Sequence, residues 1–258
     1  MSEEVLLEIR ERIAYITLNR PQSLNSMNAG LVEGVHLALD QAEADAAVRV
    51  IILTGAGKAF CAGGDLTYLE TLESTADKKA FIEKVGAMAQ KIMHMQKPVI
   101  AMVNGVTAGA GVNLMLACDL VYAVDTARFA QSFAKVGLVP DCGGMYLLPK
   151  TIGVHKAKEL MYTADLIDCA TADKLGMINH VCTAATLQEE TEKMAQRLAA
   201  SAPIALGIIK STLNDRELSL DQVLSIESTA QPLCLATKDC AEGIKAFKEK
   251  RSPQFSGK

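Results

Sequence analysis

Two kinds of apolar pattern alternate along the first part of the chain. Short runs rich in β-branched residues favour strands at Val5 to Ile9, Ala14 to Asn19, Arg49 to Thr54, Val99 to Val103 and Leu120 to Val124. Between them, apolar residues recur at helical spacing over about residues 29–45 and 77–96. Asn28 stands where an N-cap of the first helix is expected. Strands that alternate with helices predict a β/α core.

After Gly144 the pattern becomes mainly helical. We expect one last strand at Met177 to Val181 and helical segments at Tyr146 to Leu148, Val154 to Tyr162, Ala170 to Leu175, 184–200, 203–214, 219–230 and 238–249. This change of pattern predicts a core over residues 1–200 and a C-terminal helical region over 201–258.

Two glycine-rich turns follow strand-like runs. Gly109-Ala110-Gly111 lies between the run that ends at Val103 and the short apolar helix Val112 to Cys118. N–H groups at the start of a helix lack intrahelical partners, and the helix dipole favours negative charge there. This turn is therefore a candidate anion hole. An earlier turn, Ala62-Gly63-Gly64-Asp65, follows Ala59-Phe60-Cys61.

Composition excludes some partners. A net charge of −4, a pI near 5.7 and few aromatic residues give no reason to expect nucleic acid or an anionic membrane as partner. The seven cysteines form no CxxC pair, the start of the chain is acidic rather than signal-like, and no apolar run reaches membrane-spanning length. The four histidines show no metal-ligand spacing. We expect a cytoplasmic protein with reduced thiols and no metal.

Several segments together resemble the crotonase family, the enoyl-CoA hydratase/isomerase superfamily. They are ITLNRPQSLNSMN (16–28), VIILTGAGKAFCAGGDL (50–66), PVIAMVNGVTAGAG (98–111), GLVPDCGG (137–144) and EGIKAFKEKRSPQF (242–255). The resemblance implies an α/β fold, a spiral of ββα units with a C-terminal helical trimerisation region. It also implies a homotrimer or homohexamer that acts on acyl-CoA. Coenzyme A would then be part of the substrate, and no cofactor is expected.

The resemblance places the thioester oxygen of the substrate between the backbone N–H groups of Gly64 and Ala110. Removing a proton beside a thioester builds negative charge on that oxygen, and one such fixed donor is worth roughly 2.7–4 kcal/mol. The alternative is that both turns only let strands bend into helices.

The acidic residues around that oxygen decide the reaction. Hydratases of the family use two glutamates, and the equivalent positions here are Asn113 and Phe133, neither of which is a general base. Asp141 remains, and the segment around it most resembles phenylacetate-pathway isomerases. One carboxylate suits a double-bond shift from 3-enoyl-CoA to 2-enoyl-CoA, or the isomerisation of an epoxyphenylacetyl-CoA, with Phe133 as an apolar wall against water. Asp65 and Asp119 are expected to be structural.

Alternatives stay open for the base and for the function. Asp141 precedes a helix-like segment and is also a candidate N-cap. The chain is alternatively an enoyl-CoA hydratase, or another acyl-CoA hydrolase or lyase, with a non-standard base. A dehalogenase with a nucleophilic aspartate and a non-catalytic coenzyme A- or RNA-binding scaffold are less favoured.

The resemblance also implies coenzyme A contacts at the backbone of Ser23 and Leu24, at Ala62 and Leu66 near the adenine, and at Phe247 and Lys250. The last two belong to a terminal segment that in the family can reach a neighbouring subunit's ligand. The alternative for Lys250 is a place on a solvated basic face.

Overall fold

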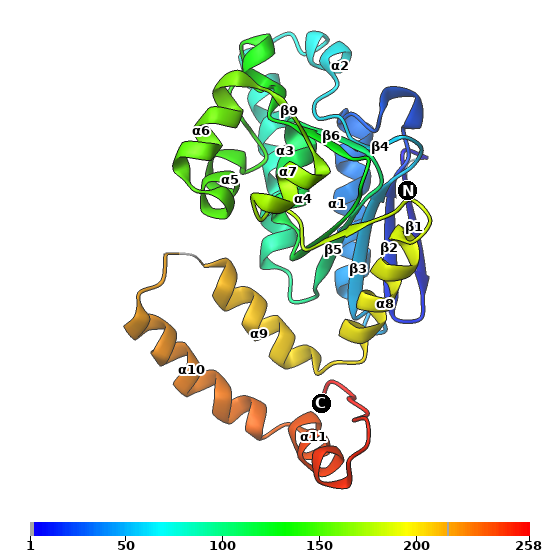
Figure 1. The fold of residues 1–258 in the computed structure, drawn as a ribbon, viewed down its shortest axis with the longest axis vertical. Helices are drawn as coiled ribbons and strands as arrows, with labels where there is room; N and C mark the ends of the chain where they lie inside the picture. The colour runs from blue at the N-terminus through cyan, green and yellow to red at the C-terminus, as the bar shows by residue number, and fades with distance from the viewer. Residues whose placement is uncertain (1–2, 216) are drawn as a thin grey trace.

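The computed structural model describes residues 3–215 and 217–258, and their strands form two sheets (Figure 1). The larger, six-stranded sheet has the order β1 (Val5–Arg10), β2 (Ile13–Leu18), β3 (Val50–Gly55), β5 (Val99–Val103), β7 (Leu120–Val124), β10 (His180–Cys182). The smaller, four-stranded sheet has the order β4 (Ala59–Cys61), β6 (Val106–Ala108), β8 (Arg128–Ala130), β9 (Leu166–Asp168).

From β3 to β8, consecutive strands alternate between the two sheets. β3, β5 and β7 lie in the larger sheet, and each is followed by a short strand of the smaller one, β4, β6 or β8. Neighbours within these two sets pair in parallel, whereas β1–β2 and β8–β9 pair antiparallel. The chain therefore winds as a spiral of ββα turns. The carboxyl ends of β4 and β6, from which the two glycine turns leave, lie side by side.

Helices cover this spiral and fill its centre. Their bounds are α1 (Ala29–Ala44), α2 (Leu66–Glu70), α3 (Thr75–His94), α4 (Ala110–Ala117), α5 (Gly144–Ile152), α6 (Val154–Thr163), α7 (Cys169–Lys174) and α8 (Leu187–Ala199). Every residue of α4 is buried, as expected for a helix in which all residues except Asn113 are apolar or small. α1 begins at the predicted cap, since the Asn28 side chain accepts from the Leu31 N–H at 2.9 Å.

Three helices extend away from the sheets at the lower end of Figure 1: α9 (Pro203–Asn214), α10 (Leu220–Leu235) and α11 (Lys238–Glu249). Lys210 on α9 ion-pairs with Asp119 at 2.7 Å and donates to the Lys97 carbonyl at 2.9 Å. Asp119 also accepts from the Val99 N–H at 2.7 Å. This aspartate therefore anchors α9 to the sheet, which agrees with the structural role expected for it.

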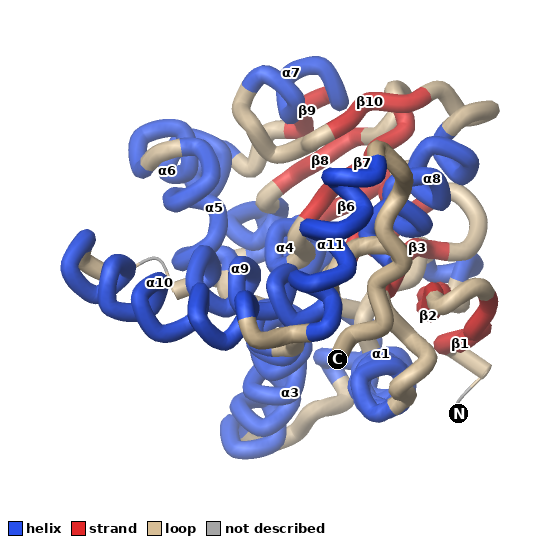
Figure 2. Tube along the Cα trace, turned by 90° about the horizontal axis from the view of Figure 1, so that it is seen from below, coloured by secondary structure: helices blue, strands red, loops and turns tan. Residues whose placement is uncertain are grey.

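The last residues of the chain run back along α11 (Figure 2). The Asp239 carboxylate accepts from the N–H groups of Ser256 and Gly257 at 2.6 and 2.8 Å, and Arg49 donates to the Ser256 carbonyl at 2.7 Å. The predicted boundary at residue 200 falls between α8 and α9. No helix among the described residues is both long and apolar enough to span a bilayer.

The differences from the predicted elements are local. The sequence does not reveal β6, β8 and β9, because strands of three residues are too short to show alternation. The last strand begins at His180 rather than Met177, since the Met177 N–H bonds to the Ala172 carbonyl in the preceding turn. α10 runs on to Leu235, with Pro232 in its last turn.

Candidate active site

The two glycine turns pack directly against each other. A Cβ placed on Gly63 would lie 2.9 Å from the Ala108 carbonyl oxygen and 3.4 Å from the Ala110 nitrogen. One placed on Gly111 would lie 2.2 Å from the Cys61 carbonyl oxygen. Only glycine permits these approaches. The turns predicted from separate motifs therefore form one surface.

The two N–H groups expected to bind the thioester oxygen belong to this surface. Ala110 is the first residue of α4, after Gly109 at φ 52°, which offers no side-chain cap. Gly64 forms an isolated bridge with Met27, made by the Gly63 carbonyl and the Asp65 N–H. Within the described part of the chain, neither the Gly64 nor the Ala110 N–H donates a hydrogen bond. Two unsatisfied donors in adjacent turns can hold an oxyanion.

Asp141 lies in the loop before α5, and its carboxylate is not a helix cap. The N-cap of α5 is Gly143, at φ 75° and without a side-chain bond, so the N-cap alternative for Asp141 is wrong. Its Oδ1 is buried and has no hydrogen-bond partner among the described residues. Burial raises the pKa of Asp141 to about 6, although its own backbone N–H partly opposes the shift. A carboxylate held in this state is poised to accept a proton.

Two buried amides connect the Asp141 loop to α4. Asn113, one turn after Ala110, donates from Nδ2 to the Asp141 carbonyl oxygen at 2.9 Å. Gln131 donates from Nε2 to Asn113 Oδ1 at 2.7 Å. The sequence analysis treated Asn113 only as a missing base and overlooked Gln131, because nothing in the sequence pattern relates residue 131 to residue 113.

Phe133 lies against the start of α4. It is 8% exposed, and a Cβ on Gly109 would lie 3.5 Å from its ring. The thiols of Cys61 and Cys142 are fully buried nearby, and burial raises the pKa of Cys61 to about 12. These side chains place apolar or un-ionised groups beside Asp141 and the start of α4.

Asp65 is bound on all sides and stabilises the first glycine turn. Its carboxylate caps α2 through the Tyr68 N–H at 3.2 Å and pairs with Arg20 at 2.9 Å. Burial alone would raise the pKa of Asp65, but the bonds from Arg20 and Tyr68 outweigh it and lower the pKa. The structural role expected for Asp65 fits these contacts.

The remaining predicted contacts divide between two places. Four of them lie around the first glycine turn: Ser23, Leu24, Ala62 and Leu66. The Ala62 N–H donates to the Leu24 carbonyl at 2.9 Å, Ser23 ends a 3-10 turn just before, and Leu66 begins α2. Phe247 and Lys250 instead lie at α11, at the opposite end of the molecule from α2 in Figure 1. Within one chain, those two are not brought to the turns.

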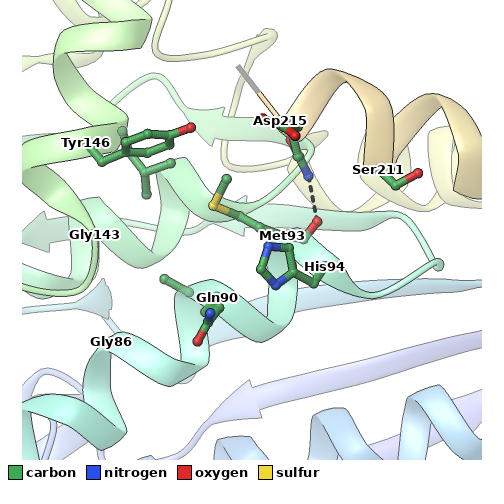
Figure 3. Close-up of a pocket in the computed structure, with 11 residues that line it drawn as sticks. Gly86, Gln90, Met93, His94, Gly143, Tyr146, Ser211 and Asp215 are labelled. Atoms are coloured by element: carbon green, nitrogen blue, oxygen red, sulfur yellow. Dashed lines mark hydrogen bonds between the residues drawn. The ribbon is translucent and has the colours of Figure 1, made fainter. Parts of the chain in front are cut away.

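A cavity of about 590 Å³ opens between α3, α5 and α9 (Figure 3). Gly86 and Gln90 line it from α3, Tyr146 from α5 and Ser211 from α9. It reaches the loop that holds Asp141 through Gly143, but its lining does not include Gly64, Ala110 or Asp141. The cavity therefore borders the loop that holds Asp141, and the two glycine turns do not line it.

One cluster of potential metal ligands was not visible in the sequence. Atoms of His180, Cys182 and Glu190 lie within 4.8 Å of one another, and the His180–Glu190 pair is joined at 2.5 Å. The spacing of the histidines could not show this, because Glu190 comes from α8.

Comparison with known proteins identifies the family over nearly the whole chain. The enoyl-CoA hydratase/isomerase family model matches residues 8–258. The chain is 38% identical to the 1,2-epoxyphenylacetyl-CoA isomerase of Escherichia coli (strain K12), over 100% of both chains. It is 36% identical to the crotonyl-CoA hydratase of Syntrophomonas wolfei, over 99% of both. The crystal structure of an enoyl-CoA hydratase from Bacillus anthracis superposes with a TM-score of 0.95 at 33% identity, covering 99% of this chain and 100% of that one. The spiral fold and the resemblance are thereby confirmed, and the chain belongs to the enoyl-CoA hydratase/isomerase family.

Proposed function

We propose that the protein is an enoyl-CoA isomerase in which Asp141 is the single base. Asp141 takes a proton from C2 of a 3-enoyl-CoA, and the electrons move onto the thioester oxygen. The Gly64 and Ala110 N–H groups hold that oxygen, and each is worth roughly 2.7–4 kcal/mol to the transition state. The resulting acid returns the proton at C4, which moves the double bond into conjugation.

The observation that carries this proposal is the state of Asp141. A buried carboxylate oxygen without a hydrogen-bond partner lowers the stability of the fold. The Asp141 side chain does not offset this cost, because it does not cap α5. A pKa near 6 makes it a stronger base than an ordinary aspartate while leaving it mostly ionised at neutral pH.

The surroundings favour proton transfer over hydration. Adding water across a double bond needs a group that holds and deprotonates the water as well as a partner that manages the proton at C2. Asn113 has both sides of its amide engaged in hydrogen bonds, and Phe133 is apolar. Hydration would therefore depend on Asp141 alone, and it is the alternative that the experiment below separates.

The substrate has two candidate forms. One is an unsaturated fatty acyl-CoA. The other is a ring-derived acyl-CoA, which is supported by the 38% identity to the 1,2-epoxyphenylacetyl-CoA isomerase. Both need an enolate held by the same two N–H groups, so one active site serves either. Faster turnover of the unsaturated fatty acyl-CoA would indicate a role in fatty acid metabolism, and faster turnover of the ring-derived acyl-CoA a role in phenylacetate degradation.

A homotrimer or homohexamer fits the exposed apolar surface of the last helices. Leu220 on α10 is 72% exposed and Phe247 on α11 is 85% exposed, more than expected for a helix pair facing only water. Assembly through these helices would carry Phe247 and Lys250 to the acyl-CoA of a neighbouring copy. Light scattering of the purified protein tests this, and a monomer would contradict it.

The experiment that tests the function follows the ultraviolet absorbance of the conjugated thioester. Wild type and Asp141→Asn are each given a 3-enoyl-CoA, and a 2-enoyl-CoA is offered separately to detect hydration. We expect isomerisation by wild type and its loss in the variant. Hydration that survives in Asp141→Asn would overturn the mechanism, as would a wild type that binds acyl-CoA without turnover.

A further inference from the structure

Three side chains from separate segments form one buried chain of hydrogen bonds. Gln131, just after β8, donates to Asn113 on α4, and Asn113 donates to the carbonyl of Asp141 before α5. Asn113 is 0% exposed and Gln131 is 2% exposed. Water therefore does not substitute for either bond without a rearrangement of the core.

The direction of these bonds follows from the chemistry at the far end. A backbone carbonyl only accepts, so the group that Asn113 turns toward Asp141 must be its NH₂. Its oxygen then faces Gln131, which must supply an N–H in turn. This leaves Gln131 Oε1 as a buried oxygen that has no partner among the described residues. The amide at position 113 satisfies both neighbours, whereas a carboxylate cannot donate and an apolar side chain can neither donate nor accept.

The loop that Asn113 holds has an unfavourable backbone conformation. Cys142 has φ 48° and Gly143 has φ 75°, in the left-handed region that residues with side chains rarely occupy. A Cβ on Gly144 would lie 2.2 Å from Asn113 Nδ2, so the amide is enclosed on that side as well. Such a conformation persists only where surrounding contacts fix it.

We propose that Asn113 is a positioning residue for the base, and that Gln131 fixes Asn113 in turn. Asn113 holds the Asp141 carbonyl, and the loop then directs the carboxylate into the apolar site with Oδ1 free for the substrate. This inference rests on the proposed function. It also gives position 113 a role of its own: a glutamate there would not add a second base but would release the first.

The main test is Asn113→Ala, which removes the donor without adding charge. The loop should relax and hydrate Asp141. We expect kcat for a 3-enoyl-CoA to fall about 10- to 100-fold with KM changed less than about threefold. The acid limb of the kcat pH profile should move to lower pH. Activities are compared per folded protein, measured by near-ultraviolet circular dichroism.

The matched control is Asn104→Ala. Asn104 also donates to backbone carbonyls, those of Gly57 at 3.0 Å and Ala59 at 3.3 Å, but it does not touch the base loop. It should lower the melting temperature while leaving kcat and the acid limb unchanged. If both asparagine variants lose stability and neither alters kcat or the limb, Asn113 is merely structural and the inference fails.

Two further variants keep the test decisive. Gln131→Met removes the donation to Asn113 together with the unpartnered oxygen, and it should shift kcat in the same direction by about 3- to 10-fold even if Asn113→Ala does not fold. Asn113→Glu should lose isomerisation and gain no hydration. An Asn113→Glu enzyme that isomerises normally and hydrates a 2-enoyl-CoA would overturn the inference.

Failure of the function and failure of the inference give different results. The Asp141 carboxyl is titrated by carbon-13 NMR, with its signal assigned through its loss in Asp141→Asn. A wild type without isomerase activity, in which Gln131→Met still lowers the Asp141 pKa, would remove the function and retain the positioning. If wild type is active, and Asn113→Ala and Gln131→Met both keep its kcat and its Asp141 pKa, the function is retained and the positioning role is rejected.

Discussion

Two aspartates have similar sequence contexts, but their carboxylates have different hydrogen-bond environments in the fold. Asp65 follows a glycine turn and precedes α2, and Asp141 follows a proline and precedes α5. The Asp65 carboxylate is bound by Arg20 and by the Tyr68 N–H. The Asp141 carboxylate caps nothing, and one of its oxygens is buried without a partner. A satisfied carboxylate stabilises a loop, whereas an unsatisfied one is available for chemistry.

The proton affinities of the two groups diverge accordingly. Burial acts in the same direction on both, but at Asp65 it is outweighed by hydrogen bonds and the pKa falls. At Asp141 burial is nearly unopposed, and the pKa rises to about 6. The comparison therefore teaches that partners, rather than burial alone, decide which carboxylate can act as a base.

The largest expected effect separates the two aspartates by activity. Asp141→Asn should lower kcat/KM for a 3-enoyl-CoA by about 10²–10⁴-fold, the usual worth of a general base. Asp65→Asn keeps a capping side chain and should cost less than about tenfold. Both are measured by the rise in conjugated-thioester absorbance. Equal losses of kcat/KM in Asp141→Asn and Asp65→Asn would contradict a catalytic role specific to Asp141.

The next effect is on stability, where replacing Asp65 should cost more than replacing Asp141. Asp65→Ala removes a helix cap and leaves the mostly buried Arg20 with Glu4, at 3.1 Å, as its one acidic partner among the described residues. We expect a loss of about 2–4 kcal/mol in the free energy of unfolding. Urea unfolding at pH 7 measures it, with Asp65→Asn as the milder control. An unchanged midpoint in Asp65→Ala would show that these contacts do not stabilise the turn.

Replacing Asp141 should instead raise the free energy of unfolding at high pH. Because the folded-state pKa of Asp141 is raised from 3.8 to about 6, its stability contribution is present below pH 4 and is lost as pH rises through 6. Asp141→Asn does not ionise, so it should be more stable than wild type by about 1–3 kcal/mol at pH 8 and equal to it near pH 4. Thermal unfolding at the two pH values tests this. A destabilised variant at pH 8 would identify Asp141 as a structural residue after all.

The smallest expected effect is the fall in wild-type kcat/KM at acid pH. kcat/KM should fall below an apparent pKa near 6, so that activity at pH 5 is roughly a tenth of its plateau. The neighbouring thiols do not titrate in this range, because burial raises the pKa of Cys61 to about 12 and raises that of Cys142 as well. A limb near pH 4 would instead indicate an exposed, ordinary carboxylate.

The sequence was sufficient for the longer strands and helices and for the two glycine turns. β5 and β7 have the predicted bounds, because buried parallel strands are continuous apolar runs. The two glycine turns were found for the same reason that they meet: close backbone contact excludes side chains, and glycine marks such contact in a sequence.

The relations between distant residues were beyond the sequence. Gln131 and Asn113 are ordinary polar residues until the fold places one amide against the other. The Asp141 loop resembled a helix cap because local pattern cannot tell a cap from a carboxylate that the backbone turns aside. His180, Cys182 and Glu190 likewise meet only because α8 packs beside β10.

The burial of every residue of α4 has a consequence for how this family changes its chemistry. The helix that presents the Ala110 N–H is also the centre of the folded core, so substitutions within its apolar turns are penalised as loss of folding before they can alter catalysis. Positions outside the helix, such as 133 and 141, are less constrained by its packing. Under the proposed mechanism, the N–H donor to the thioester oxygen therefore lies in the buried helix, whereas the proposed base lies in a loop outside it.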